Sequence, residues 1–110
     1  MSNDLTTQKC VPCEGGIPPL TLSQYQPYLS QVDGWEIVDN KQLTREFKFE
    51  NFASALEFVN QIGKLTEQEN HHPDIFLHNW NKVTVTLSTH AIHGLSTNDF
   101  ILAAKISIIM

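Results

Sequence analysis

The hydrophobic residues of this chain recur with two different periods, and these periods predict its helices and strands. Between positions 52 and 65, apolar residues recur every three or four positions, as they do along one face of an α-helix. The predicted apolar face consists of Phe52, Ala55, Leu56, Val59, Ile62 and Leu65. Asn51 is suited to cap this helix, which should run to about Glu69 and stop before His72, because a residue that precedes proline is disfavoured in the helical conformation.

A regular alternation of apolar and polar residues predicts β-strands over 43–49 and 82–89. The residues expected to share one face are Leu43, Arg45, Phe47 and Phe49 in the first strand, and Val83, Val85 and Leu87 in the second. Residues 35–38 should pair with the first strand as a hairpin, across the polar residues 39–42. A shorter strand is expected at 75–78.

Capping signals predict a helix at each end of this series. Thr21 and Gln24 form a capping box, so a short helix should follow and end at Leu29 or Val32. Pro27 makes this helix less regular, because proline cannot donate the backbone hydrogen bond of a helix interior.

Ser96 and Asp99 form a second such signal, which predicts a final helix over 100–109. This helix is apolar almost all round, so it is either sunk into the core or packed against another copy of the protein. A single sheet layer cannot enclose a whole helix in so short a chain. We therefore predict a homodimer or homotetramer formed through the C-terminal helix.

The expected order is helix, two strands, long helix, two strands, helix, which is an α+β fold with helices on one face of an antiparallel sheet. Residues 20–110 should form a single domain. Residues 1–19 hold three of the five prolines and two of the five glycines, so we expect an extended or partly mobile N-terminal arm there.

Composition narrows the class of protein. With 110 residues, of which 41% are hydrophobic and 17% charged, the chain fits one globular domain. Its formal net charge of −5 argues against a duplex-binding surface, since such surfaces neutralise phosphates with many cations. No apolar run is long enough to span a membrane, and the first residues lead us to expect no secretion signal. We expect a cytoplasmic protein with no nucleic-acid or membrane partner.

All five histidines lie between positions 71 and 93. His71, His72 and Pro73 follow the long helix, and His90 ends the last strand. Imidazole titrates near neutral pH, so a group of histidines suits proton transfer. Glu67 precedes His71 by four residues, so on a continuing helix it could orient that ring.

Other interpretations of these residues exist. His78 and His93 are best interpreted as structural or surface residues, and Asp99 chiefly as a helix cap. Trp80 could stack on a flat ligand or cover the sheet. A metal site would draw on His71, His72, His90 and either Glu67 or Asp74, but no recognised ligand spacing is present. Cys10 and Cys13 supply only half of a tetrahedral zinc site, so we expect no metal and no cofactor.

Three motifs, in this order, resemble those of the pterin-4a-carbinolamine dehydratases. They are Glu67-x-x-x-His71-His72-Pro73, the strand that ends at Thr89-His90, and Gly94-Leu95-Ser96-x-x-Asp99. The resemblance covers about residues 20–109, and Cys10-Val11-Pro12-Cys13 also resembles bacterial members. Two features depart from the animal enzymes: the stretch 73–83 is one residue longer, and Asn70 replaces an acid.

The resemblance implies an α+β fold with a four-stranded antiparallel sheet and helices on one face, assembled as dimers or tetramers. It implies dehydration of 4a-hydroxytetrahydropterin to the quinonoid dihydropterin, which recycles the cofactor of aromatic amino-acid hydroxylases. The residues it implies as catalytic are His71, His72 and His90. Those it implies as substrate-binding are Glu67, His71, His72, Pro73, Thr89, His90, Ala91, Ile92 and Asp99.

This reaction removes a proton from N5 and delivers one to the departing 4a-hydroxyl, which imidazoles can do near pH 7. We expect His71 and His90 to be the acid/base pair and His72 to polarise or orient the hydroxyl. The alternative is a non-catalytic binding, assembly or coactivator-type module that uses the apolar face of the last helix.

Overall fold

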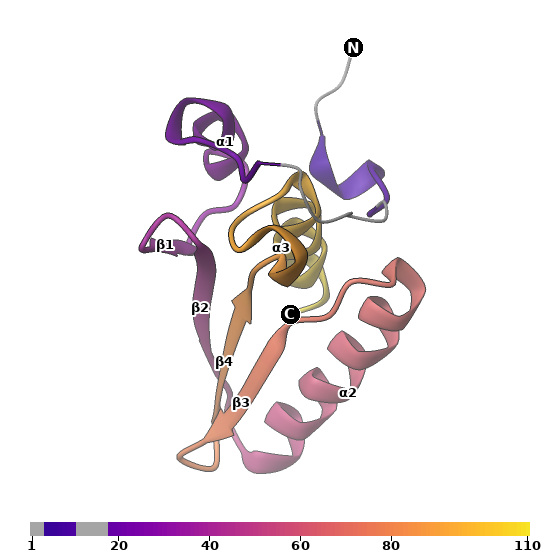
Figure 1. Ribbon diagram of the computed structural model, residues 1–110. Helices are drawn as coiled ribbons and strands as arrows, with labels where there is room; N and C mark the ends of the chain where they lie inside the picture. The colour runs from indigo at the N-terminus through magenta and orange to yellow at the C-terminus, as the bar shows by residue number, and fades with distance from the viewer. Residues whose placement is uncertain (1–3, 11–17) are drawn as a thin grey trace.

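The computed structural model describes residues 4–10 and 18–110. Within them, four strands form one antiparallel sheet in the order β1-β2-β4-β3 (Figure 1). The strands are β1 (Glu36–Val38), β2 (Gln42–Lys48), β3 (Asp74–His78) and β4 (Lys82–Leu87), and the helices are α1 (Leu22–Leu29), α2 (Phe52–Glu69) and α3 (Thr97–Ile109). The predicted α+β class and the four-stranded antiparallel sheet are confirmed.

Each of the two hairpins turns through a pair of residues with positive φ. Asp39 and Asn40 (φ 54° and 56°) join β1 to β2, and Asn79 and Trp80 (φ 47° and 57°) join β3 to β4. Two successive left-handed residues suit the right-handed twist of the strands that they join, and Asp and Asn tolerate this conformation better than most residues. The turn places Trp80, which is 62% exposed, at the end of the β3–β4 hairpin (Figure 1).

The core lies between one face of the sheet and the helices. The alternation in β4 is confirmed, since Val83, Val85 and Leu87 are fully buried. On β2 they are joined by Leu43 and Phe47, with the Arg45 guanidinium 4.5 Å from the centre of the Phe47 ring.

The predicted bounds of α2 and its cap at Asn51 are confirmed, because the Asn51 side chain accepts a hydrogen bond from the Ser54 backbone N–H. The predicted apolar face is partly wrong. The buried residues are Ala55, Phe58, Ile62 and Thr66. Phe52 and Leu56 are 50% and 42% exposed, because the face that meets the sheet is rotated toward Phe58.

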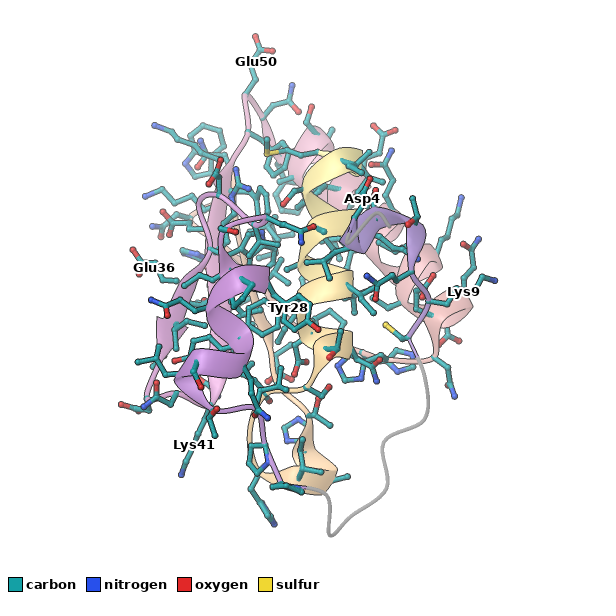
Figure 2. All side chains as sticks on the ribbon, turned by 90° about the horizontal axis from the view of Figure 1, so that it is seen from above. Asp4, Lys9, Tyr28, Glu36, Lys41 and Glu50 are labelled. Carbon is teal, nitrogen blue, oxygen red and sulfur yellow. The ribbon has the colours of Figure 1, made fainter. Side chains whose placement is uncertain are left out.

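Helix α3 is buried within its own chain. Residues from Asn98 to Ala104, together with Ile106, are buried, and α3 contacts α1, α2, β2 and the 3₁₀ turn η1 (Leu5–Thr7). The ring of Tyr28 lies 5.7 Å from that of Phe100, and Figure 2 shows Tyr28 beside α3. The argument that this helix needs another copy of the protein to cover it was wrong, because α1, α2 and the N-terminal turn cover the sides that the sheet leaves open.

Part of the N-terminal segment, expected as an extended or mobile arm, is folded onto the domain. The Asp4 carboxylate caps η1, and Leu5 is fully buried beside α3. Cys13 and the rest of residues 11–17 lie outside the described residues. None of the helices in the described part of the chain is long and apolar enough to cross a membrane.

Candidate active site

The histidine pair follows a sharp reversal at the end of α2. Asn70 caps the helix in the left-handed conformation (φ 54°), and its N–H donates to the Thr66 carbonyl. The His71 N–H donates to the same carbonyl at 3.4 Å. Asparagine tolerates positive φ better than most residues, which gives a physical reason for Asn70 at this position.

His71 turns inward and meets a buried acid. Its Nε2 lies 2.7 Å from Asp99 Oδ1, with the His71 side chain 13% exposed and the Asp99 side chain fully buried. An ionised carboxylate can only accept hydrogen bonds, so Nε2 carries the hydrogen and Nδ1 of the neutral ring keeps a lone pair. The contact therefore fixes both the ring orientation and the nitrogen that can accept a proton.

The other Asp99 oxygen is held by the start of α3 and the end of the sheet. Oδ2 accepts from the Ser96 backbone N–H (3.0 Å) and from the Thr89 hydroxyl (2.8 Å). Since that hydroxyl donates to Asp99, the Ser96 hydroxyl, 2.7 Å away, must donate to Thr89. Asp99 is the helix cap that the sequence predicts and, in addition, the partner of His71.

Glu67 contacts His72 rather than His71. Its Oε2 lies 2.5 Å from His72 Nε2, and both side chains are largely exposed, by 77% and 54%. The expected i,i+4 contact with His71 was wrong, because the helix ends at Glu69 and the reversal at Asn70 takes His71 off the helical face. Each histidine of the pair thus has its own carboxylate.

His90 is exposed and lies next to Thr89 on the short 3₁₀ turn His90–Ile92. Thr89 and Gly94 exchange backbone hydrogen bonds of 2.8 and 3.4 Å, which close this loop. A pocket of about 210 Å³ opens beside it. Its lining residues are Lys41, Gln42, Ser88, Thr89, His90, His93 and Gly94.

The structure thus brings the segments of His71 and His90 together through one carboxylate, since Asp99 binds His71 and also Thr89. His71 and His72 are not among the described residues that line the pocket beside His90. Among the other predicted site residues, Pro73 is half-buried, Ala91 exposed and Ile92 buried.

His78 lies on the sheet, away from this cluster. Its Nε2 is 2.9 Å from the Thr84 hydroxyl and 3.5 Å from a Glu46 carboxylate oxygen, and its ring stacks on Phe76 at 4.5 Å. These contacts agree with the structural role predicted for it. Trp80 lies in the β3–β4 turn, beyond the end of β3 opposite to that which follows His71.

A partly buried ion pair braces the end of α2 near His71. Lys105 Nζ of α3 lies 2.8 Å from Glu69 Oε2, and the Cys10 backbone N–H donates to Glu69 Oε1 at 2.9 Å. Burial disfavours the Glu69 charge, but these donors outweigh it and hold the pKa of its carboxyl below the ordinary value. Burial, reinforced by the Glu69 charge, raises the pKa of the Cys10 thiol to about 12.

Sequence reasoning missed the roles of Lys41, Gln42 and Glu69. Lys41 and Gln42 reach the pocket only because the β1–β2 turn lies beside the loop after β4, a contact with no local signal. Glu69 could have been noticed as an acid in the last turn of a helix, where it is unfavourable without a partner. Among the described residues, no group of three or more potential metal ligands comes together.

Known proteins are similar to this chain in sequence and in fold. The model of the family described as pterin 4 alpha carbinolamine dehydratase matches residues 18–109. A relative from Rubrobacter xylanophilus that carries the family's name is 46% identical over 104 residues, which cover 94% of this chain and 96% of that protein. One from Alkaliphilus metalliredigens is 49% identical over 105 residues, 94% of each chain. A solved structure from Brucella melitensis is described as a transcriptional coactivator/pterin dehydratase. It matches this chain with a TM-score of 0.77 and 38% sequence identity, and the match covers 83% of this chain and 97% of the Brucella chain.

Proposed function

Because the chain belongs to the pterin-4a-carbinolamine dehydratase family, we propose that this hydro-lyase removes water from 4a-hydroxytetrahydropterin by histidine acid/base catalysis. The product would be the quinonoid dihydropterin, from which the tetrahydropterin cofactor is regenerated. The observation that supports this proposal most directly is the buried carboxylate of Asp99, which binds His71 and, through Thr89, adjoins His90.

The reaction needs a base and an acid on one bicyclic ring. The N5–H bond breaks and its electron pair forms the N5=C4a double bond, while the C4a–O bond breaks and the hydroxyl leaves as water after it takes up a proton. We assign the base to His71, because Asp99 holds its Nε2–H and leaves Nδ1 as the acceptor. The same carboxylate would stabilise the imidazolium that forms.

His90 is then the acid that protonates the departing hydroxyl, and His72, paired with Glu67, orients that hydroxyl. In this arrangement the remaining substrate contacts come from Glu67, Pro73 and the segment 89–92. Neither proton transfer calls for a metal or a redox cofactor.

The test is the rate at which quinonoid product appears, followed by ultraviolet absorbance after addition of the carbinolamine. We expect His71→Ala and His90→Ala each to lower kcat by about 10²- to 10⁴-fold, the usual contribution of one acid/base group. His78→Gln is the matched control, since His78 lies on the sheet and outside the cluster. Unchanged kinetics in either alanine variant would refute the role given to that histidine.

A binding or coactivator-type role is the second candidate, and the name of the Brucella structure favours it. The surface first expected to serve it, the apolar face of α3, is buried in the chain itself. The exposed apolar residues Phe52 and Leu56 on α2 are a better candidate surface. Absence of any acceleration of dehydration by the wild-type protein would favour this role.

We also propose that the protein is a cytoplasmic homodimer or homotetramer with a small-molecule substrate and no nucleic-acid partner. The part of the C-terminal helix still available for assembly is its end, where Ile108 and Met110 are 66% and 61% exposed. A solution mass equal to one chain at micromolar concentration would contradict the proposed assembly.

A further inference from the structure

The pocket beside His90 is built from two separate parts of the chain. The β1–β2 turn contributes Lys41 and Gln42, and the loop after β4 contributes residues 88–90 with His93 and Gly94. Lys41 lies at one end of the sheet, with Glu50 at the other (Figure 2). The loop is closed by its Thr89–Gly94 bridge, and His93 adopts the left-handed conformation (φ 55°) with its N–H bonded to the His90 carbonyl.

The side chains that line this pocket are basic or neutral, whereas the chain as a whole has a negative net charge. Three of the seven lining residues that lie in the described part of the chain are Lys41, His90 and His93, and none of those seven is an aspartate or a glutamate. The chain as a whole has twelve acids, seven Lys and Arg residues and a net charge of −5. A local group of basic side chains with neutral donors between them, here Ser88 and Gln42, favours an anion.

The size of the pocket decides how much of a ligand it can take. Sites that enclose a whole drug-sized ligand have volumes of roughly 300–1,000 Å³. This pocket has about 210 Å³, and its lining does not include His71 or His72 among the described residues. The pocket is therefore suited to a substituent of the substrate. The pterin ring itself would lie outside the pocket, against His71 and His72.

From these observations we infer that the pocket of Lys41, His90 and His93 binds an anionic substituent, a carboxylate or a phosphate, on the pterin substrate. This inference rests on the proposed function and narrows its substrate class to pterins whose side chain carries negative charge. Lys41, from the β1–β2 turn, supplies the fixed charge, and the imidazole of His93, from the loop after β4, supplies a donor.

The test compares paired probes that share the pterin ring and differ in the charge of the 6-substituent: 6-hydroxymethylpterin with its phosphate monoester, and the methyl ester of pterin-6-carboxylate with the free acid. Binding is followed by pterin fluorescence. We expect the wild-type protein to prefer the charged member of at least one pair, and this preference to fall as salt increases. Which pair shows it distinguishes phosphate from carboxylate.

Lys41→Gln should reduce the preference by about threefold to fivefold, the effect of one solvent-exposed ion pair. His93→Gln should reduce it in the same direction. Lys48→Gln is the matched control, because Lys48 is also exposed but lies at the other end of β2. Circular dichroism verifies that each variant is folded.

Equal affinity for both members of each pair, or an unchanged preference in Lys41→Gln, would overturn the inference. If the neutral 6-methyl carbinolamine is still dehydrated in that case, the proposed function stands and only the anion subsite is lost. If no pterin binds and no carbinolamine is dehydrated, the proposed function fails and the subsite with it.

Discussion

Asp99 carries three hydrogen bonds from three different parts of the site. Its two oxygens accept from the His71 ring, the Thr89 hydroxyl and the Ser96 backbone N–H, and the side chain has no exposure to solvent. A buried carboxylate is costly unless such donors compensate its charge. The residue that caps α3 therefore also determines where the His71 ring lies and which of its nitrogens is free.

This double role predicts the effect of Asp99→Asn, which keeps the shape but leaves one acceptor oxygen. Either Ser96 or His71 then loses its acceptor, or the His71 ring changes tautomer. We expect dehydration to slow by about 10²-fold or more. We also expect the acidic limb of the pH–rate profile, where the catalytic base becomes protonated, to move. Nitrogen NMR of His71 would report the tautomer, which a purely structural defect would leave unchanged. Asp74→Asn, at an exposed position, should keep the wild-type pH profile.

At the scale of helices and strands, local patterns were sufficient for caps and for most bounds. Two predicted bounds were wrong: the last helix begins at Thr97 rather than at 100, because its capping box lies at Ser96, and β4 ends at Leu87 rather than at 89, because the chain turns into the loop after it. The capping boxes at Thr21 and Ser96 and the cap at Asn51 are present as predicted, because caps depend on residues within one turn. The buried face of α2 was not predictable to the same degree. The periodicity locates an apolar stripe, but only packing on the sheet decides that Phe58 is buried and Phe52 is not.

The glycines give a matched test of packing at this scale. A Cβ at Gly94 would lie 2.6 Å from Cβ of Pro19, whereas a Cβ at Gly63 of α2 would have no neighbour within 4 Å. We expect Gly94→Ala to destabilise the fold by about 1–3 kcal/mol, because the loop beside His90 must move. Gly63→Ala should stabilise it by up to about 1 kcal/mol through helix propensity. Urea unfolding of both variants measures these effects, and equal shifts would contradict the close approach of Pro19.

At the scale of the whole molecule, contacts between distant segments hold the site together. The Cys10 backbone N–H donates to the Glu69 carboxylate, 59 positions later in the sequence. Lys105, a further 36 positions along, donates to the same carboxylate. No local period carries such contacts, which is why the pairing of His71 with Asp99 and the enclosure of α3 could not be predicted from sequence patterns. The resemblance of the motifs to a family led us to expect His71, Thr89 and Asp99 in one site, and in the structure Asp99 is hydrogen-bonded to both His71 and Thr89.

The Glu69–Lys105 pair predicts how the stability of the whole fold depends on pH. The pKa of Glu69 is lowered in the folded state from its ordinary value of 4.5, so its stabilising effect is complete above that pH and is lost as the pH falls through the lowered value. Glu69→Gln leaves Lys105 without its charged partner and should cost about 1–3 kcal/mol at pH 7. The difference from the wild-type free energy of unfolding should narrow steadily below about pH 4.5. Urea titrations between pH 7 and pH 3 measure it, with Glu57→Gln, exposed on the same helix, as the control. A difference that stays constant over this range would mean that the Glu69 charge contributes nothing to bracing the end of α2.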